Sequence, residues 1–201
     1  MYSTKTATTN NTEFTSSYMP VGINENVHLK EVNINKTPNG RDFLEFIFEN
    51  ENGQTATMTE WKNEKNIWIK TDEDLQNRDN QQFGRILQII DAVKDSHPDF
   101  EGSSFVEMIN WVKDTIGDIT NNKLLRLKVV YDKKGYTKVS SLGVFVEPMS
   151  IDEKDSQIKL WKNDLLERPV VADDESVADD PLSVNTAPVT EDTTGADDLP
   201  F

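Results

Sequence analysis

The sequence predicts a mainly β domain that carries a helical insert and is followed by an acidic tail. Three observations support this fold class. Alternating or densely apolar segments, separated by turn sequences, occupy residues 27–61 and 124–146. Between them, apolar residues recur at spacings of three, four and seven, which is typical of amphipathic helices. From residue 169 onward, prolines and acidic residues dominate and there is almost nothing to bury.

The sequence of the first half of the domain predicts three strands. The first has its apolar positions at Val27, Leu29, Val32 and Ile34. These positions change phase once, so a one-residue β-bulge is expected near Lys30–Glu31. Further extended segments, introduced by turn-forming residues, are expected at residues 43–48, 55–61 and, as a short continuation of the sheet, 66–70.

Two helices are expected in the middle of the chain. The apolar face of the first is formed by Leu75, Phe83, Ile86, Leu87, Ile90 and Val93. Its pattern stops before His97-Pro98. The second helix begins near Ser103 or Ser104, and its apolar face is formed by Phe105, Met108, Ile109, Val112 and Ile116.

Two more strands are expected at residues 124–131 and 136–146, joined by the turn 132–135. The sequence Ser150-Ile151-Asp152-Glu153 matches a capping box and predicts a last short helix. The apolar face of that helix would contain Ile158, Trp161 and Leu165.

The order of three strands, a helical insert at about residues 71–118 and two strands is that of a five-stranded OB-type β-barrel. A generic α+β sandwich with the same element order is the alternative. The expected organisation is therefore a flexible N-terminal arm at residues 1–20, the OB-type domain at residues 21–167 and a disordered acidic tail at residues 168–201.

Composition limits the classes of function. The chain has no cysteine, which excludes disulfides and thiolate metal sites. Of the net charge of −15, residues 168–201 contribute −8 and the remainder −7, so any nucleic-acid site must be a local basic patch. The N-terminus lacks the apolar region of a signal peptide, and no apolar run approaches ~18 residues. We therefore expect a cytoplasmic protein that does not contact membranes.

The tail closes on Asp197-Asp198-Leu199-Pro200-Phe201. This acidic, proline-containing end resembles the C-terminal tip of bacterial single-stranded DNA-binding proteins, and several phage proteins with the same role also end in an acidic tail with a terminal Phe. The resemblance covers residues 196–201 only. It implies that Phe201 fills an apolar pocket of a partner enzyme while its α-carboxylate meets an Arg or Lys. Asp197 and Asp198 would meet basic residues around that pocket, and Leu199-Pro200 would keep the chain extended.

The body departs from the bacterial family in its longer helical insert and in lacking a Gly/Gln-rich linker. The resemblance therefore points to a divergent, phage-type member that acts in DNA replication, recombination or repair. Its compartment would be the bacterial cytoplasm or a phage-infected host cell. The family's tetramer does not carry over, and a monomer or dimer is expected instead.

A protein that binds single-stranded DNA with little sequence preference needs cations for phosphates and aromatic faces for bases. Residues 123–138 form the most basic stretch of the chain, with six bases against Asp132 alone. Within it, Arg126 and Lys128 are expected to face outward, because the alternating leucines would enter the barrel. The candidate DNA-binding residues are Lys36, Arg41, Phe43, Trp61, Lys62, Lys65, Trp68, Lys70, Arg126, Lys128, Tyr131, Lys133, Lys134, Tyr136 and Lys138. A solvated face with lysines guarding an edge strand is the alternative for the hairpin, and Trp61 and Trp68 could instead fill the core.

Catalysis has little support in the sequence. Neither His28 nor His97 has a suitably spaced partner, and no phosphate-binding glycine motif or nucleophile elbow occurs. The acids at residues 72–74 could hold Mg²⁺, but acids at a helix start more often complement the helix dipole. We expect no enzyme activity, cofactor or metal. The competing functions are a protein-interaction adaptor with a solubilising tail, favoured by the acidic body, and a metal-dependent nuclease.

Overall fold

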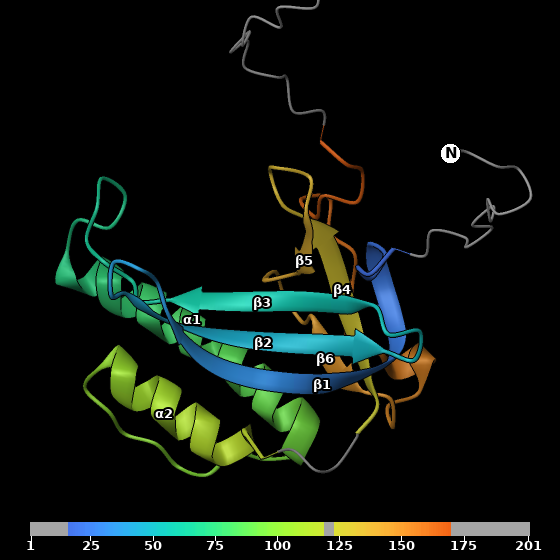
Figure 1. The fold of residues 1–201 in the computed structure, drawn as a ribbon, viewed down its shortest axis with the longest axis horizontal. Helices are drawn as coiled ribbons and strands as arrows, with labels where there is room; N and C mark the ends of the chain where they lie inside the picture. Colours follow the sequence, from blue (N-terminus) through green and yellow to red (C-terminus); the bar gives the residue numbers. More distant parts are fainter. Residues whose placement is uncertain (1–15, 119–122, 170–201) are drawn as a thin grey trace, which may run out of the picture. The chain divides into compact units, whose positions relative to one another are not determined.

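Six antiparallel strands form one open sheet in the computed structural model, which describes residues 16–118 and 123–169 (Figure 1). The mainly β class with a helical insert is confirmed. The strands are β1 (Gly22–Lys36), β2 (Asp42–Asn50), β3 (Thr55–Trp61), β4 (Leu125–Tyr131), β5 (Thr137–Val139) and β6 (Val146–Pro148).

The strand order is β3-β2-β1-β4-β5, and β6 pairs with β4 as well. The long strand β1 therefore joins the two halves of the sheet, pairing with β2 along one edge and with β4 along the other. Strands β3 and β5 are the two ends of this order. They approach each other, but within the described residues no hydrogen-bonded ladder joins them.

Two irregularities shape β1. The bulge expected near Lys30–Glu31 is confirmed, because the register with β2 shifts between Leu29 and Glu31. A second shift, against β4, falls between Asn24 and Val27, where Asn26 has a positive φ of 55°. Bulges increase local twist and bend a strand, which allows one strand to serve two partners lying in different directions.

The connections after β1 and β2 are tight. Gly40 and Gly53 have φ of 77° and 72°, a region that side chains other than glycine rarely adopt. The third predicted strand is confirmed at residues 55–61. The expectation that residues 66–70 continue the sheet is wrong, because the side chain of Asn66 accepts hydrogen bonds from the backbone N–H groups of Trp68 and Ile69 and closes a turn there.

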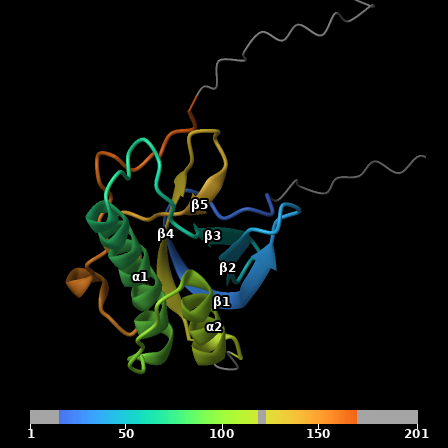
Figure 2. The same cartoon turned by 90° about the vertical axis from the view of Figure 1, so that its left-hand side faces the viewer.

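The insert contains two helices, α1 (Asp72–Lys94) and α2 (Phe105–Ile116), packed on the sheet (Figure 2). A capping box between Thr71 and Asp74 begins α1, and Ser104 caps α2. Apart from Leu75, the apolar residues predicted for both helices pack with the strands in one core. Its fully buried side chains include Phe46, Phe48, Ile86, Ile90, Ile109, Leu125 and Phe145.

The C-terminal half differs from the prediction in two respects. The expected strand at residues 136–146 is interrupted, and its two pieces, β5 and β6, both pair with β4. The expected helix after Ser150 is reduced to one 3-10 turn, η1 (Glu153–Asp155), and residues 156–168 form no helix or strand. Local capping signals are weak when tertiary contacts supply other partners for the backbone.

The folded part begins before residue 21, the predicted start of the domain. The backbone of Thr55 exchanges hydrogen bonds with Ser17 and Met19, and Met19 is fully buried. The remainder of the predicted arm and almost all of the predicted tail lie outside the described residues. Neither described helix has the length and apolar character needed to cross a membrane.

Candidate nucleic-acid interface

An aromatic stack lies where β2 begins and β3 ends. Phe43 and Trp61 are cross-strand partners, and their ring centroids are 4.5 Å apart with an interplanar angle of 29°. The guanidinium carbon of Arg41 lies 5.5 Å from the Trp61 ring centroid, in cation–π range. Arg41 also donates to the Lys62 carbonyl at 2.9 Å. Trp61 keeps 37% of its surface exposed, so the stack can accept a further flat group.

The stack is held in place from beneath by a buried carboxylate. Glu60, the neighbour of Trp61, is 5% exposed and accepts two hydrogen bonds from Arg85 of α1, at 2.8 and 2.9 Å. Gln82 of α1 donates to both Glu60 and the Trp61 carbonyl at 2.8 Å. These bonds fix the end of β3 to α1, and they restrict the orientation of the Trp61 backbone.

The loop 62–70 continues from Trp61 and presents a second aromatic residue. The turn closed by Asn66 leaves Ile67 and Trp68 at its tip, 73% and 81% exposed. Lysines flank this tip: Lys65 pairs with Asp72 at 2.6 Å, whereas exposed Lys62 and Lys70 form no ion pair with any described residue.

The β4–β5 turn, residues 132–136, forms the opposite projection. One Asp132 carboxylate oxygen accepts from the backbone N–H groups of Lys134 and Tyr136, at 2.8 and 2.9 Å. The hydrogen bond from Tyr136, then that from Lys134 and the nearby lysine charges, outweigh partial desolvation and hold the pKa of Asp132 below its ordinary value. The turn thereby exposes Lys133 and Lys134, which have no ion-pair partner in the described part of the chain.

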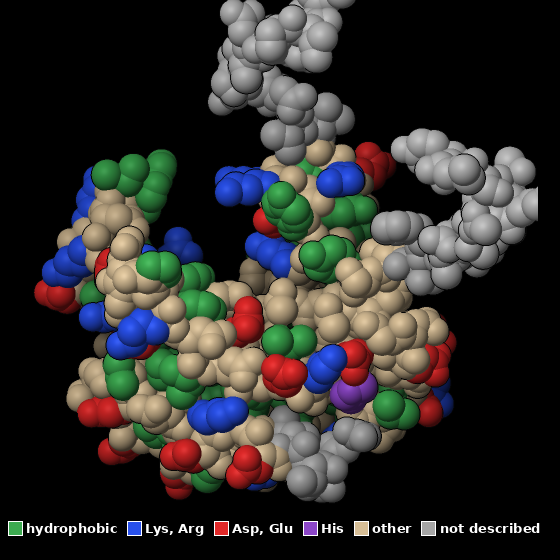
Figure 3. Space-filling view, in the orientation of Figure 1, with side chains coloured by type: hydrophobic (Ala, Val, Ile, Leu, Met, Phe, Trp, Pro, Cys, Tyr) green, Lys and Arg blue, Asp and Glu red, His purple; other side chains and the backbone are tan. Residues whose placement is uncertain are grey.

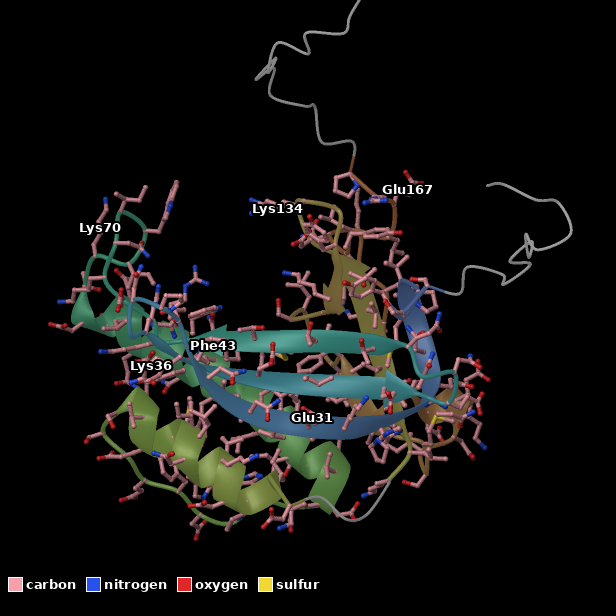
Figure 4. All side chains as sticks on the ribbon, viewed as in Figure 1. Glu31, Lys36, Phe43, Lys70, Lys134 and Glu167 are labelled. Carbon is pink, nitrogen blue, oxygen red and sulfur yellow. The ribbon has the colours of Figure 1, made fainter. Side chains whose placement is uncertain are left out.

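The surface is hollowed between the loop 62–70 and the β4–β5 turn, and basic side chains lie on both projections (Figure 3). Lys70 and Lys134 stand on opposite sides of this hollow, and Phe43 lies between them near the end of β3 (Figure 4). The face of β1–β3 beyond Phe43 is acidic instead. There Glu31, Glu45 and Glu49 outnumber Lys30, which pairs with Glu49 at 2.6 Å. A polyanion would therefore meet attraction at the hollow and repulsion along the middle of the sheet.

The expectation that Arg126 and Lys128 face outward is wrong. Arg126 is 4% exposed and pairs with Glu147 at 2.5 Å, while Lys128 is fully buried against Asp164. Strand β4 is central, and all of its residues from Leu125 to Val130 are buried, so both of its faces are covered. These two cations hold the fold together and are not available to phosphates.

The other predicted residues divide between two places. The first place is the border of the hollow, made by the two projections and the stack. The predicted residues there are Arg41, Phe43, Trp61, Lys62, Lys65, Trp68, Lys70, Lys133 and Lys134. Lys36 is exposed and pairs with Asp42 at 3.2 Å beside the stack. Lys138 is exposed on β5, Tyr136 is 66% exposed, and Tyr131 is partly buried. The predicted docking residues at positions 197–201 lie outside the described residues.

The Glu60–Arg85 contact also has a signal in the sequence. Glu60 occupies the buried phase of β3, after Ala56 and Met58, and an acid in an apolar phase predicts a cationic partner such as Arg85. The described residues contain no cluster of three or more His, Cys, Asp or Glu positioned to hold a metal ion. No protein-family model matches the chain, and no curated protein matches it significantly.

Proposed function

We propose that the protein binds single-stranded DNA along the hollow between the loop 62–70 and the β4–β5 turn, with little sequence preference. The observation that carries this proposal is the exposed Phe43–Trp61 stack beside lysines that have no ion-pair partner among the described residues. Every base has a flat face for stacking and every nucleotide a phosphate, so this combination binds strands independently of sequence. Coating and protecting single strands during replication, recombination or repair is the corresponding role.

The strand order supports the finer proposal of an OB-type barrel. β1 pairs with both β2 and β4, the helices lie between β3 and β4, and β3 approaches β5. OB-type barrels bind oligonucleotides across their second and third strands, between the β1–β2 and β4–β5 loops. Here Arg41 follows the β1–β2 turn, Phe43 and Trp61 belong to β2 and β3, and Lys133 belongs to the β4–β5 turn.

Recruitment of partner enzymes by residues 197–201 remains part of the proposal and is supported by the sequence resemblance alone. A second candidate function is a protein-interaction adaptor. It is favoured by the acidic charge of the body and by the apolar side chains of Leu142, Leu160 and Trp161, which are 43%, 47% and 52% exposed.

A titration with oligo-dT in the absence of metal, at two salt concentrations, tests the proposal. Binding should quench tryptophan fluorescence, because Trp61 and Trp68 would contact bases, and should weaken as salt rises. Duplex DNA of the same length, whose bases are already stacked, serves as the control and should quench less. Absence of quenching and of binding at low salt would favour the adaptor, and metal-dependent shortening of the oligonucleotide would favour a nuclease.

A further inference from the structure

A second concavity lies on the other side of the β4–β5 turn from the hollow. In both ribbon views the turn stands between the loop 62–70 and the N-terminal segment that leads into β1 (Figures 1 and 2). The cleft between this segment and the turn has a volume of about 390 Å³. The side chains that give it chemical character are Tyr18, Gln54, Tyr131, Tyr136, Thr137 and Arg168.

Both walls of the cleft are held by contacts with neighbouring segments. Tyr18 forms a bridge with Thr55, Met19 next to it is fully buried, and Gln54 donates to the Ser16 carbonyl at 3.1 Å. On the turn, Gly135 has a φ of 81°, and a Cβ there would come within 3.0 Å of Arg168 Nε. The missing side chain thus allows the guanidinium to lie against the turn at the edge of the cleft.

The side chains that line the cleft limit the chemical class of ligand it can bind. Tyr18 and Tyr136 are 62% and 66% exposed, and Tyr131 is partly buried beneath them. Among the described lining residues, Arg168 supplies the only charge and none is acidic. Aromatic faces beside one guanidinium suit a nucleobase with its phosphate.

We propose that this cleft is a second nucleotide-binding subsite, which takes one base and its phosphate from a single strand that leaves the hollow across the β4–β5 turn. This inference rests on the proposed function. The turn is the common wall of the hollow and the cleft, and Lys133 and Lys134 at its tip would bind the phosphates between them. The strand would then contact a face of the protein that the β2–β3 site does not include.

The test compares affinity across a series of oligo-dT lengths that spans the site size of about 4–16 nucleotides per OB fold. Tyr18→Leu should weaken binding of the longer oligonucleotides by about 5- to 150-fold, because a stacking contact is lost. Arg168→Ala should weaken binding of the same oligonucleotides, because a phosphate contact is lost. The shortest oligonucleotides, which fill only the hollow, should bind as tightly as to the wild type. Tyr18→Phe should retain wild-type affinity, because the aromatic face remains. Arg78→Ala, at an exposed position on α1, is the matched charge control.

A second measurement locates the strand directly. Oligo-dT with a photoreactive uracil at successive positions should crosslink to Tyr18 from the positions nearest one end only. Unchanged affinity of both variants at every length, together with no crosslink to Tyr18, would overturn the subsite and leave the proposed function intact. Failure of the wild type to bind at any length would overturn the proposed function itself. Thermal melting confirms folding, and Arg168→Ala continues the test if Tyr18→Leu melts early.

Discussion

Lys128 and Asp164 form an ion pair of 3.1 Å in which neither side chain is exposed to solvent. Lys128 Nζ also donates to the carbonyls of Leu142 and Lys159, at 2.8 and 3.0 Å, so all three of its hydrogens are used. Asp164 in turn accepts from Ser140 Oγ and from the Trp161 backbone N–H. The pair attaches the irregular segment 156–168 to β4, together with the hydrogen bonds from Lys128 Nζ to the Lys159 carbonyl and from Tyr131 N–H to the Leu165 carbonyl.

Removing one partner of this pair should destabilise the domain. We expect Lys128→Met to lower the free energy of unfolding by about 3–5 kcal/mol, because Asp164 would remain buried without a counter-charge. Urea denaturation measures this loss. Lys138→Met, on the neighbouring strand but exposed, should change stability by no more than about 0.5 kcal/mol. A change of that small size in Lys128→Met would show that the segment is not held by the pair.

Protonation of Glu147 should lower the free energy of unfolding in mild acid. Desolvation by itself would raise the pKa of Glu147, but hydrogen bonds from Ser156, Arg126 and the Gln157 backbone N–H outweigh it and hold the pKa below 4.5. A carboxyl group whose pKa is lowered by folding stabilises the protein at pH values above its pKa in the unfolded chain. This stability is lost as the pH falls through its pKa in the folded protein. The free energy of unfolding should therefore decrease below pH 4.5.

Urea denaturation across this pH range measures the effect. Glu147→Gln should be less stable than the wild type at neutral pH, because Arg126 loses its buried counter-charge. The variant should also lose less stability in acid. Parallel pH profiles of the two proteins would assign the acid sensitivity to other carboxylates.

Stacking on Trp61 and Trp68 should supply a large part of the affinity for single strands. Trp61→Ala should fold, since the side chain is 37% exposed, and should lose about 1–3 kcal/mol of binding free energy to oligo-dT. Trp68→Ala should behave similarly, because Trp68 is 81% exposed beside Lys70. Fluorescence titration measures both affinities. Trp161→Ala removes an exposed tryptophan from the segment 156–168 and should bind like the wild type; an equal loss in that variant would refute a specific stack.

Lys133 and Lys134 should account for part of the salt dependence. Each phosphate contact contributes about 0.7 to the slope of log affinity against log salt for single strands, so replacing both lysines with Ala should flatten the slope by about 1.4. Affinity should fall alike for all sequences. The control is a variant that replaces Lys154 of η1 and Lys159 of the segment 156–168 with Ala. Both lysines are exposed, and an unchanged slope is expected. A flattening of similar size in the control would indicate a diffuse charge effect.

The acidic tail should compete with DNA. Residues 170–201 contain nine acids and no base, and a tethered polyanion is present at high effective concentration near any basic site on the same chain. Deleting them should tighten oligo-dT binding, most visibly at low salt, where screening is weakest. Deleting Phe201 alone keeps the side-chain charges and should leave DNA affinity unchanged while abolishing capture of partner enzymes from a host lysate. Equal capture by both proteins would show that the tip is not a docking motif.

The elements with local signals could be predicted from the sequence. The bulge in β1, strand β3 and the apolar faces of α1 and α2 all follow from residue periodicity, because a strand or helix must place one face against the core. The residues of the aromatic stack were also identifiable, since Trp61 and Phe43 flank basic turns. Their cross-strand contact was not, because register depends on the turn between β2 and β3.

Which segment covers each face of the sheet depends on tertiary packing and could not be predicted from the sequence. Alternation in β4 correctly placed Leu125 and Leu127 inside, but it could not show that the segment 156–168 and Glu147 cover the other face and bury Lys128 and Arg126. The same limit applies to the cleft, where Tyr18, Tyr136 and Arg168 come from three distant parts of the chain. Periodicity records the direction of a side chain relative to its own strand, whereas burial depends on which remote segment packs against it.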